Sequence, residues 1–333
     1  MLAAALLLMP APARAVIDVP LQDVTIRSKQ IDAFRIGRAD EPRFGELTFL
    51  GGLELLSGNR HMGGLSGLVL SADGREMVAI ADNGLWLTAT IDADPNGRPL
   101  AVRDARLGAI IGPNGRPLMD RGRGDAEALT LRRNPDGTGE LYMATERYHA
   151  IYAFPYPLTD PRTPGRPIDL PAAMTGNLRH NKGMEAVAFA NSGPLAGTLV
   201  VVSERGQTFN SNLPGYLLGG PTPGTFTVLR QDSYDATDAA FLDNGDMVLL
   251  ERRFTLRHGI GMRVRLLPAA ELKPGALVVG RVLLEAGFSE QIDNMEGVAV
   301  HRNAAGETIL TIVSDDNRSI LQRTLLLRFR IDG

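Results

Sequence analysis

The 333-residue chain contains no cysteine. This absence excludes a disulfide framework, a thiolate nucleophile, a zinc–thiolate site and an iron–sulfur cluster, and it leaves the redox compartment open. Lysine is nearly absent too, so the positive charge is carried almost entirely by arginine. With a net charge of −3 the chain has no basic field of the kind that drives nucleic-acid binding, and we expect no nucleic-acid partner.

Long apolar runs are also missing. No segment reaches the roughly 18 apolar residues that a membrane helix needs, so we expect no membrane span. Residues 1–15 read MLAAALLLMPAPARA and end in a small-x-small pattern typical of signal-peptidase sites, although a basic n-region is lacking. Either the true start codon lies upstream, or this stretch is a buried first strand or helix. We expect a signal peptide over 1–15 and a bacterial protein that is periplasmic or secreted.

The remaining composition is that of a soluble globular protein, with 44% hydrophobic residues, 37 glycines and 21 prolines. The length suggests about two domains, but large all-β folds exceed the usual domain size. Helical periodicity is nearly absent. The fold class must therefore be inferred from sequence patterns that repeat along the chain.

Five segments share one pattern: a small or acidic residue, an apolar strand, a turn rich in Gly, Asp or Asn, a second apolar strand, and an acidic residue followed closely by Arg or Asn. They read GLSGLVLSADGREMVAIADNG (64–84), DAEALTLRRNPDGTGELYMATER (125–147), GMEAVAFANSGPLAGTLVVVSERG (183–206), DATDAAFLDNGDMVLLERR (235–253) and NMEGVAVHRNAAGETILTIVSDDN (294–317). Each segment predicts a β-hairpin.

The repeat period predicts a β-propeller. Anchored on Ser66, Glu127, Glu185, Asp238 and Glu296, successive repeats are 61, 58, 53 and 58 residues apart, which is enough for a four-stranded blade. The two ends of the chain, 18–56 and 320–331, lie outside the repeats. We expect them to pair and close a ring of six four-stranded blades, with residues 16–333 forming one domain and a monomer.

Propeller geometry predicts an acidic channel mouth. The first strand of each inner hairpin starts on the face to which the second strand returns, so the residues at strand starts and strand ends should meet around the axis. The strand-start series is Ser66, Glu127, Glu185, Asp238 and Glu296, and the strand-end series is Asp82, Glu146, Glu204, Glu251 and Asp315. Nine of these ten residues are carboxylates, and such a cluster requires positive charge for compensation.

Two sources of positive charge are open. A hard divalent cation, Ca²⁺ above all, suits carboxylate oxygens supplied by separate loops. The alternative is ion pairing with arginines close to the strand-end acids, namely Arg147, Arg205, Arg252, Arg253 and Arg318. The strand-start acids have fewer adjacent cations and are the better candidate metal ligands. Asn294 and Asp125, two residues before their glutamates, are either further ligands or turn residues.

Other polar residues near this mouth admit both chemical and structural roles. His61, His149 and His180 flank the repeats and could act as general base or acid, or could be ordinary loop histidines. Ser66 lies in GGLSGL, which is not a nucleophile elbow, so its role is more simply that of a small residue at a strand start.

The combination of GGLSGLVL with IADNG, DAEALTL with ATER, NKGMEAVAF with VSERG, and DNMEGVAV with SDDN resembles the bacterial phytase-like family described as having esterase-like activity, from about residue 44 to the C-terminus. The resemblance implies an exported β-propeller with an acidic, calcium-dependent channel that hydrolyses phosphate or carboxylic esters. It carries the family's glutamates over to Glu127, Glu185 and Glu296, whereas Asp238 lies in a shortened version of the motif.

We therefore expect a metal-dependent hydrolase of small anionic esters. A channel cation polarises the ester and activates water, Arg147 and Arg205 clamp the anionic group, and His180 or Glu185 acts as base. A lactonase-like hydrolase is a variant of the same idea. The competing hypothesis is a non-catalytic propeller that binds an envelope ligand and uses calcium only for stability.

Overall fold

The computed structural model describes residues 18–119, 125–146, 148–176, 183–206, 208, 211–255 and 259–332. The signal segment expected over 1–15 lies outside these ranges. Regular structure within them is almost entirely β-strand, apart from the short helix α1 (Ala172–Thr175) and the 3-10 turn η2 (Ala269–Glu271). Among the described residues, no helix is long and apolar enough to cross a membrane.

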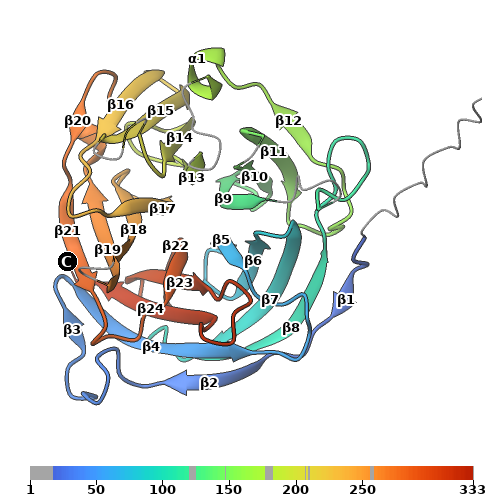
Figure 1. Cartoon of the computed structure of the whole chain (residues 1–333), viewed down its shortest axis with the longest axis vertical. Helices are drawn as coiled ribbons and strands as arrows, with labels where there is room; N and C mark the ends of the chain where they lie inside the picture. The colour runs from blue at the N-terminus through green and yellow to red at the C-terminus, as the bar shows by residue number, and fades with distance from the viewer. Residues whose placement is uncertain are drawn as a thin grey trace, which may run out of the picture.

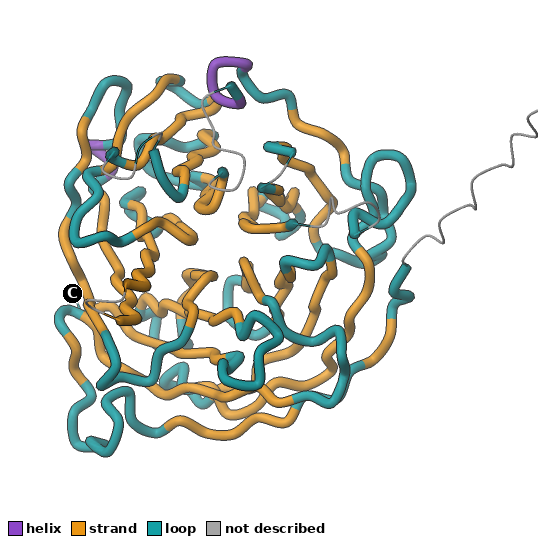
Figure 2. The backbone as a smooth tube through the Cα atoms, viewed as in Figure 1, coloured by secondary structure: helices purple, strands orange, loops and turns teal. Residues whose placement is uncertain are grey.

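The described residues form five sheets arranged radially around a central axis, as Figures 1 and 2 show. The first blade is β5 (Leu65–Leu70), β6 (Glu76–Ala81), β7 (Leu85–Ala93) and β8 (Pro99–Ala109), with β1 (Gln22–Asp23) at its outer edge. The second is β9 (Ala126–Arg133), β10 (Gly139–Thr145), β11 (Ala150–Tyr156) and β12 (Arg166–Ile168).

The third blade is β13 (Met184–Phe189), β14 (Thr198–Ser203), β15 (Leu213–Gly219) and β16 (Gly224–Val228), with β20 (Leu277–Val278) parallel to β16. The fourth is β17 (Asp235–Phe241), β18 (Met247–Thr255), β19 (Gly259–Leu267) and β21 (Arg281–Ala286). The fifth is β22 (Asn294–Arg302), β23 (Thr308–Asp315), β24 (Leu325–Ile331), β4 (Leu47–Leu56) and β2 (Arg27–Ile31), and β3 (Arg43–Phe44) pairs with β4.

The structure confirms the all-β propeller and its closure by both ends of the chain, but the prediction of six blades is wrong: there are five. The fifth repeat contributes β22 and β23, and only β24 follows it. The segment before the first repeat supplies the missing outer strands, because β4 pairs antiparallel with β24 and β2 pairs with β4. The chain ends therefore complete the fifth blade and do not build a sixth.

The core consists of one apolar layer at each blade interface. The clusters join blades one and two, two and three, three and four, four and five, and five and one. Aromatic contacts reinforce two of these layers: Trp86 meets Phe154 edge to face with ring centroids 5.0 Å apart, and Phe34 meets Phe329 at 5.0 Å. Because both faces of an inner strand are covered, β5 is buried along its whole length.

Candidate active site at the acidic channel mouth

A β-bulge occurs at the same place in every inner hairpin of the five blades. In each pair of inner strands, one residue of the first strand has no partner across the ladder, and those residues are Ser66, Glu127, Glu185, Thr237 and Glu296. A bulge takes a side chain out of the regular alternation and re-aims it. The five bulged residues therefore share one structural position near the start of the inner strand.

The strand-end position is shared in the same way. The residues paired with the position two before each bulge are Asp82, Glu146, Glu204, Arg252 and Asp315. Together the two series bring seven carboxylates and one arginine to one mouth of the ring. The clustering expected from the sequence is thus present, but its composition differs in the fourth blade.

In the fourth blade both predicted positions are off by one residue. The bulge lies at Thr237, not Asp238, and the strand end is Arg252, not Glu251. Because side chains alternate along a strand, a shift of one residue moves each side chain to the other face. The inclusion of Asp238 and Glu251 in the channel series is therefore corrected to Thr237 and Arg252.

Asp238 is fully buried, and both oxygens of its carboxylate accept hydrogen bonds from backbone amides. Its Oδ1 accepts a hydrogen bond from the Ala239 amide, and its Oδ2 accepts one from the Val298 amide of the fifth blade, both at 2.8 Å. Burial raises the pKa of this carboxyl well above its ordinary value, and the two amide hydrogen bonds oppose that shift. Asp238 thus links two blades.

Glu251 is the centre of a buried ion cluster within its own blade. Its Oε2 lies 2.8 Å from Nε of Arg263, and its Oε1 lies 2.6 Å from Nη2 of Arg265. All three side chains are almost completely excluded from solvent. The carboxylate is neutralised by two cations on β19, which satisfies it without any metal ion.

The carboxylates of the second and third blades form two interlocked triads. Asp125, Glu127 and Glu146 each offer an oxygen within 4.8 Å of the others, and so do Glu146, Glu185 and Glu204. Glu146 belongs to both groups. Glu185 and Glu204 are buried, whereas the other three are partly exposed.

Two carboxylates of these triads have raised pKa values, because burial and the neighbouring negative charges disfavour their ionised forms. Burial raises the pKa of Glu127 well above its usual value, and Asp125, Glu296 and Glu146 raise it further. Burial also raises the pKa of Glu185, followed by the charges of Glu127 and Glu204. Like charges held this close favour either proton uptake or a cation.

A hard cation fits the geometry of the triads. Ca²⁺ binds oxygen ligands at about 2.3–2.6 Å, so two oxygens on opposite sides of one ion lie roughly 5 Å apart. The oxygens within each triad are all inside 4.8 Å of one another. The donor set is entirely carboxylate, which suits Ca²⁺ better than softer metals.

Glu296 and Asn294 of the fifth blade form a polar group with Arg252 of the fourth blade, next to the triads. Glu296 Oε1 lies 3.2 Å from Nη1 of Arg252 and accepts a hydrogen bond from Nδ2 of Asn294 at 2.8 Å. Arg252 also donates to Oδ1 of Asn294 at 2.6 Å and lies 3.8 Å from Glu204. Burial raises the pKa of Glu296 to about 7, although Arg252 opposes the shift. Arginine pairing therefore balances this side of the mouth.

The remaining strand-end acids lie between the fifth and first blades. Asp82 pairs with Nη2 of Arg318 at 2.5 Å. Asp315 accepts a hydrogen bond from the Asn317 amide at 2.6 Å, and burial raises its pKa to about 6. Of the five arginines proposed from the sequence as partners for the acids, Arg252 and Arg318 are paired with acids of the mouth.

The structure describes only some of the residues predicted to be catalytic. Arg147 and His180 lie outside the described residues. Arg205 is described, and its Nε donates to Oδ2 of the buried Asp235 on β17 at 2.8 Å. His149 does border the mouth, because its ring lies against the backbone of Gly183.

Thr237 is the site residue that the sequence did not single out, and Arg252 was expected as a partner of the acids but not at the strand-end position itself. The signal was in the residues before the bulge: Asp125-Ala126-Glu127 aligns with Asp235-Ala236-Thr237, so matching these triplets gives the correct register. Anchoring on the acidic residue instead selected Asp238, the next residue along.

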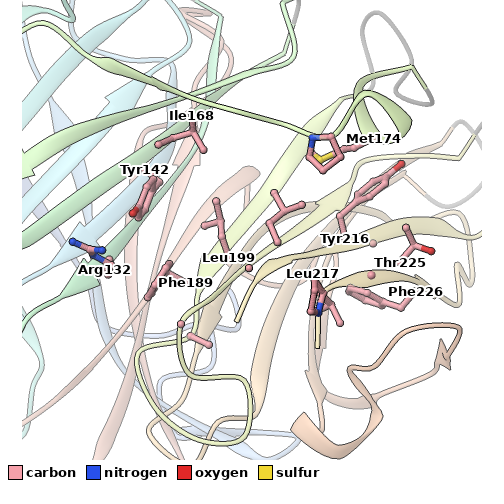
Figure 3. A pocket seen from close by; sticks show the side chains of 18 of the residues that line it. Arg132, Tyr142, Ile168, Met174, Phe189, Leu199, Tyr216, Leu217, Thr225 and Phe226 are labelled. Carbon is pink, nitrogen blue, oxygen red and sulfur yellow. The ribbon is translucent and has the colours of Figure 1, made fainter. Parts of the chain in front are cut away.

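A large cavity lies away from this mouth, between the second and third blades. It has a volume of about 1120 Å³, and Figure 3 shows side chains such as Tyr142, Phe189, Leu199 and Tyr216 around it. Its walls are mainly apolar. A second cavity of about 430 Å³ is lined by the hairpin ends of the inner strands, at the opposite mouth of the channel.

Comparison with known proteins identifies a family model. The model of the phytase-like family, described as "Esterase-like activity of phytase", matches residues 60–318. That range includes all five bulges and both triads. None of the curated proteins matches the chain.

Three solved structures are among those similar to this chain. "Structure of Dos1 propeller" matches with 10% identity and a TM-score of 0.38, covering 88% of this chain and 77% of that one. A protein of unknown function from Bacteroides caccae matches with 12% identity and a TM-score of 0.36, covering 85% and 82%. XC5397 from Xanthomonas campestris, described as a gluconolactonase, matches with 11% identity and a TM-score of 0.38, covering 91% and 97%.

Proposed function

The chain belongs to the phytase-like family described by esterase-like activity, and on that basis we propose that its acidic channel mouth hydrolyses phosphate or carboxylic esters with a bound divalent cation. One observation carries the proposal. Glu146 is shared by two carboxylate triads, and within each triad the oxygens lie within 4.8 Å of one another, which is the span of a calcium coordination sphere.

Asp125, Glu127, Glu146, Glu185 and Glu204 are the residues that hold the cation in this proposal. A divalent ion held by these residues would polarise the ester and lower the pKa of a water molecule bound to it. The partly exposed members of the triads are the ones that a substrate can reach from solvent. The buried members, Glu185 and Glu204, form the inner part of the site.

Glu296 is not one of the five proposed ligands of the cation. Its carboxylate is oriented by Asn294 and Arg252, so it can accept a proton from an attacking water. Arg252 can also stabilise negative charge that develops on the ester, because guanidinium suits oxyanions. Arg252 is therefore a further candidate for the role that the sequence assigned to Arg147 and Arg205.

Hydrolysis of 4-nitrophenyl acetate and 4-nitrophenyl phosphate tests the proposal. Removal of divalent ions with EDTA should reduce the rate at least tenfold, and added Ca²⁺ should restore it. Glu146→Gln should abolish the response to calcium, whereas Glu76→Gln, at an exposed position on β6, should behave like the parent protein.

Unchanged hydrolysis after chelation contradicts metal dependence. If neither ester is hydrolysed although Ca²⁺ raises the melting temperature of the parent protein and not of Glu146→Gln, the protein is a calcium-stabilised binding propeller, and the hydrolase proposal is wrong.

We also propose that the protein is exported, because residues 1–15 carry an apolar run followed by a small-x-small pattern. Fractionation of cells that express the full chain should recover it from the periplasm or medium, with a mature N-terminus near Val16. Recovery of an uncleaved chain from the cytoplasm would contradict this.

A further inference from the structure

A cavity of about 630 Å³ adjoins the acidic mouth between the fourth and fifth blades. Arg252 and Asn294 line this cavity, and the same two side chains contact Glu296 at 3.2 and 2.8 Å. The cavity therefore continues directly from the polar group that faces the triads. A molecule with one end at the mouth can extend its other end into this space.

The outer walls of the cavity are apolar and unusually exposed. Phe254 is 80% exposed, Phe288 is 72% exposed and Leu321 is 88% exposed. Of the phenylalanines in the described part of the chain, Phe254 and Phe288 are the ones with exposed side chains, and both line this cavity. Large apolar side chains gathered on a surface mark a binding site.

The backbone makes room for one of these rings. Gly259 has a φ of +68°, and a Cβ atom added there would lie 1.9 Å from the ring of Phe288. The ring of Phe288 therefore lies directly over the β18–β19 hairpin. Ile260, the residue after Gly259, also lines the cavity.

The charged groups on the cavity wall already have partners. The guanidinium of Arg253 lies 4.5 Å from the ring centroid of Tyr234, and Nη1 of Arg323 donates to Gln291 Oε1 at 2.8 Å. Glu290 and Asp293 add two acids to the same wall. A substrate with many phosphates needs several uncommitted cations, whereas the three arginines of this wall are engaged by Glu296, Tyr234 and Gln291.

We propose that this cavity binds the apolar part of the ester substrate while the ester group lies at the acidic mouth. The inference rests on the proposed function and narrows its substrate class to carboxylic esters that bear an aryl or medium-length acyl group. In the reaction, water adds to the ester carbonyl carbon and the bond to the alcohol oxygen breaks. A proton passes to the departing alcohol, and the carboxylic acid is released.

The test compares 4-nitrophenyl acetate, butyrate and octanoate with the calcium-loaded full chain. Each buried CH₂ contributes about 0.8 kcal/mol, roughly a three- to fourfold gain. We expect kcat/KM to rise at least tenfold from acetate to octanoate. The double variant Phe254→Ser/Phe288→Ser should lose that rise, because both side chains line the cavity that takes the acyl chain.

The matched control is Leu100→Ser/Leu277→Ser, which replaces two exposed apolar residues on β8 and β20. It should keep the dependence on acyl length. If the phenylalanine double variant also keeps it, the proposal is overturned.

A binding measurement separates this inference from the hydrolase proposal. Fluorescence titration with 1-anilinonaphthalene-8-sulfonate, an apolar anion, should show at least fivefold weaker binding to the phenylalanine double variant than to the parent and control proteins. Equal binding by all three overturns the assignment of the cavity. Loss of binding in a protein that hydrolyses none of the esters leaves the apolar site standing and rejects the hydrolase.

Discussion

The Oδ2 atom of Asp238 accepts a hydrogen bond from the amide of Val298 at 2.8 Å and thereby joins the inner strands of the fourth and fifth blades. The residue that follows the bulge in the other four blades is Gly67, Ala128, Ala186 or Gly297, none of which has a polar side chain. Asp238 is therefore a structural acid, although its spacing in the sequence resembles that of a ligand.

We predict that Asp238→Ala destabilises the protein by about 2 kcal/mol, because it leaves the buried amides of Val298 and Ala239 without acceptors. Asp238→Asn, which keeps one acceptor oxygen, should cost less. The free energy of unfolding in urea measures both effects. Asp243→Ala, on an exposed part of the same hairpin, is the control and should change stability by less than about 0.5 kcal/mol. An equal, small effect of all three would show that the Val298 contact contributes nothing.

The corrected register makes a second prediction about Glu251 and Glu146. Glu251→Gln breaks a buried ion cluster with Arg263 and Arg265, so it should cost about 3–5 kcal/mol of stability. Calcium binding, measured by calorimetry at a temperature where the variant is folded, should persist. Glu146→Gln should show the reverse pattern, with little loss of stability in EDTA and no calcium binding. Loss of calcium binding in Glu251→Gln would restore Glu251 to the ligand set.

The pH dependence of the metal-free protein follows from the raised pKa values of Glu296 and Asp315, about 7 and about 6. A carboxyl whose pKa is higher in the folded state than in the unfolded state adds stability that is complete below about pH 4 and is lost as pH rises through the folded-state value. In EDTA, the melting temperature should therefore decline between pH 5 and pH 8. Calcium requires ionised carboxylates, so its stabilising effect should be larger at pH 8 than at pH 5. A calcium effect that is equal at both values would contradict the carboxylate site.

His301 should contribute in the opposite direction. Burial, aided by Arg328, lowers its pKa to about 3, and its ring lies over Gly74 of the first blade. A histidine that stays neutral when folded loses stability as pH falls below its unfolded pKa near 6.5, by about 1.4 kcal/mol for each pH unit. Between pH 6.5 and pH 5 the parent protein should lose about 2 kcal/mol more than His301→Gln in urea titrations. Parallel curves for the two proteins would show that His301 titrates normally.

Local sequence was sufficient to predict the architecture. Turn residues such as Asp73-Gly74 and Asn244-Gly245 separate apolar strands at a regular period, and these hairpins are all present. The pairing of the two chain ends was predictable as well, since an open ring leaves strand edges unpaired. The blade number was not, because β24 has the same alternating pattern whether it completes the fifth blade with β4 or starts another.

The acidic site was also predictable from the sequence only in part. That Glu127, Glu146, Glu185 and Glu204 converge follows from the repeat and from the return of each hairpin to one face. Which residues of the fourth blade join them depends on where the bulge falls, and a shift of one residue exchanges two acids for Thr237 and Arg252. The register is set by pairing across β17 and β18 and by burial of Asp238 and Glu251 among partners distant in sequence, so only the folded ring decides it.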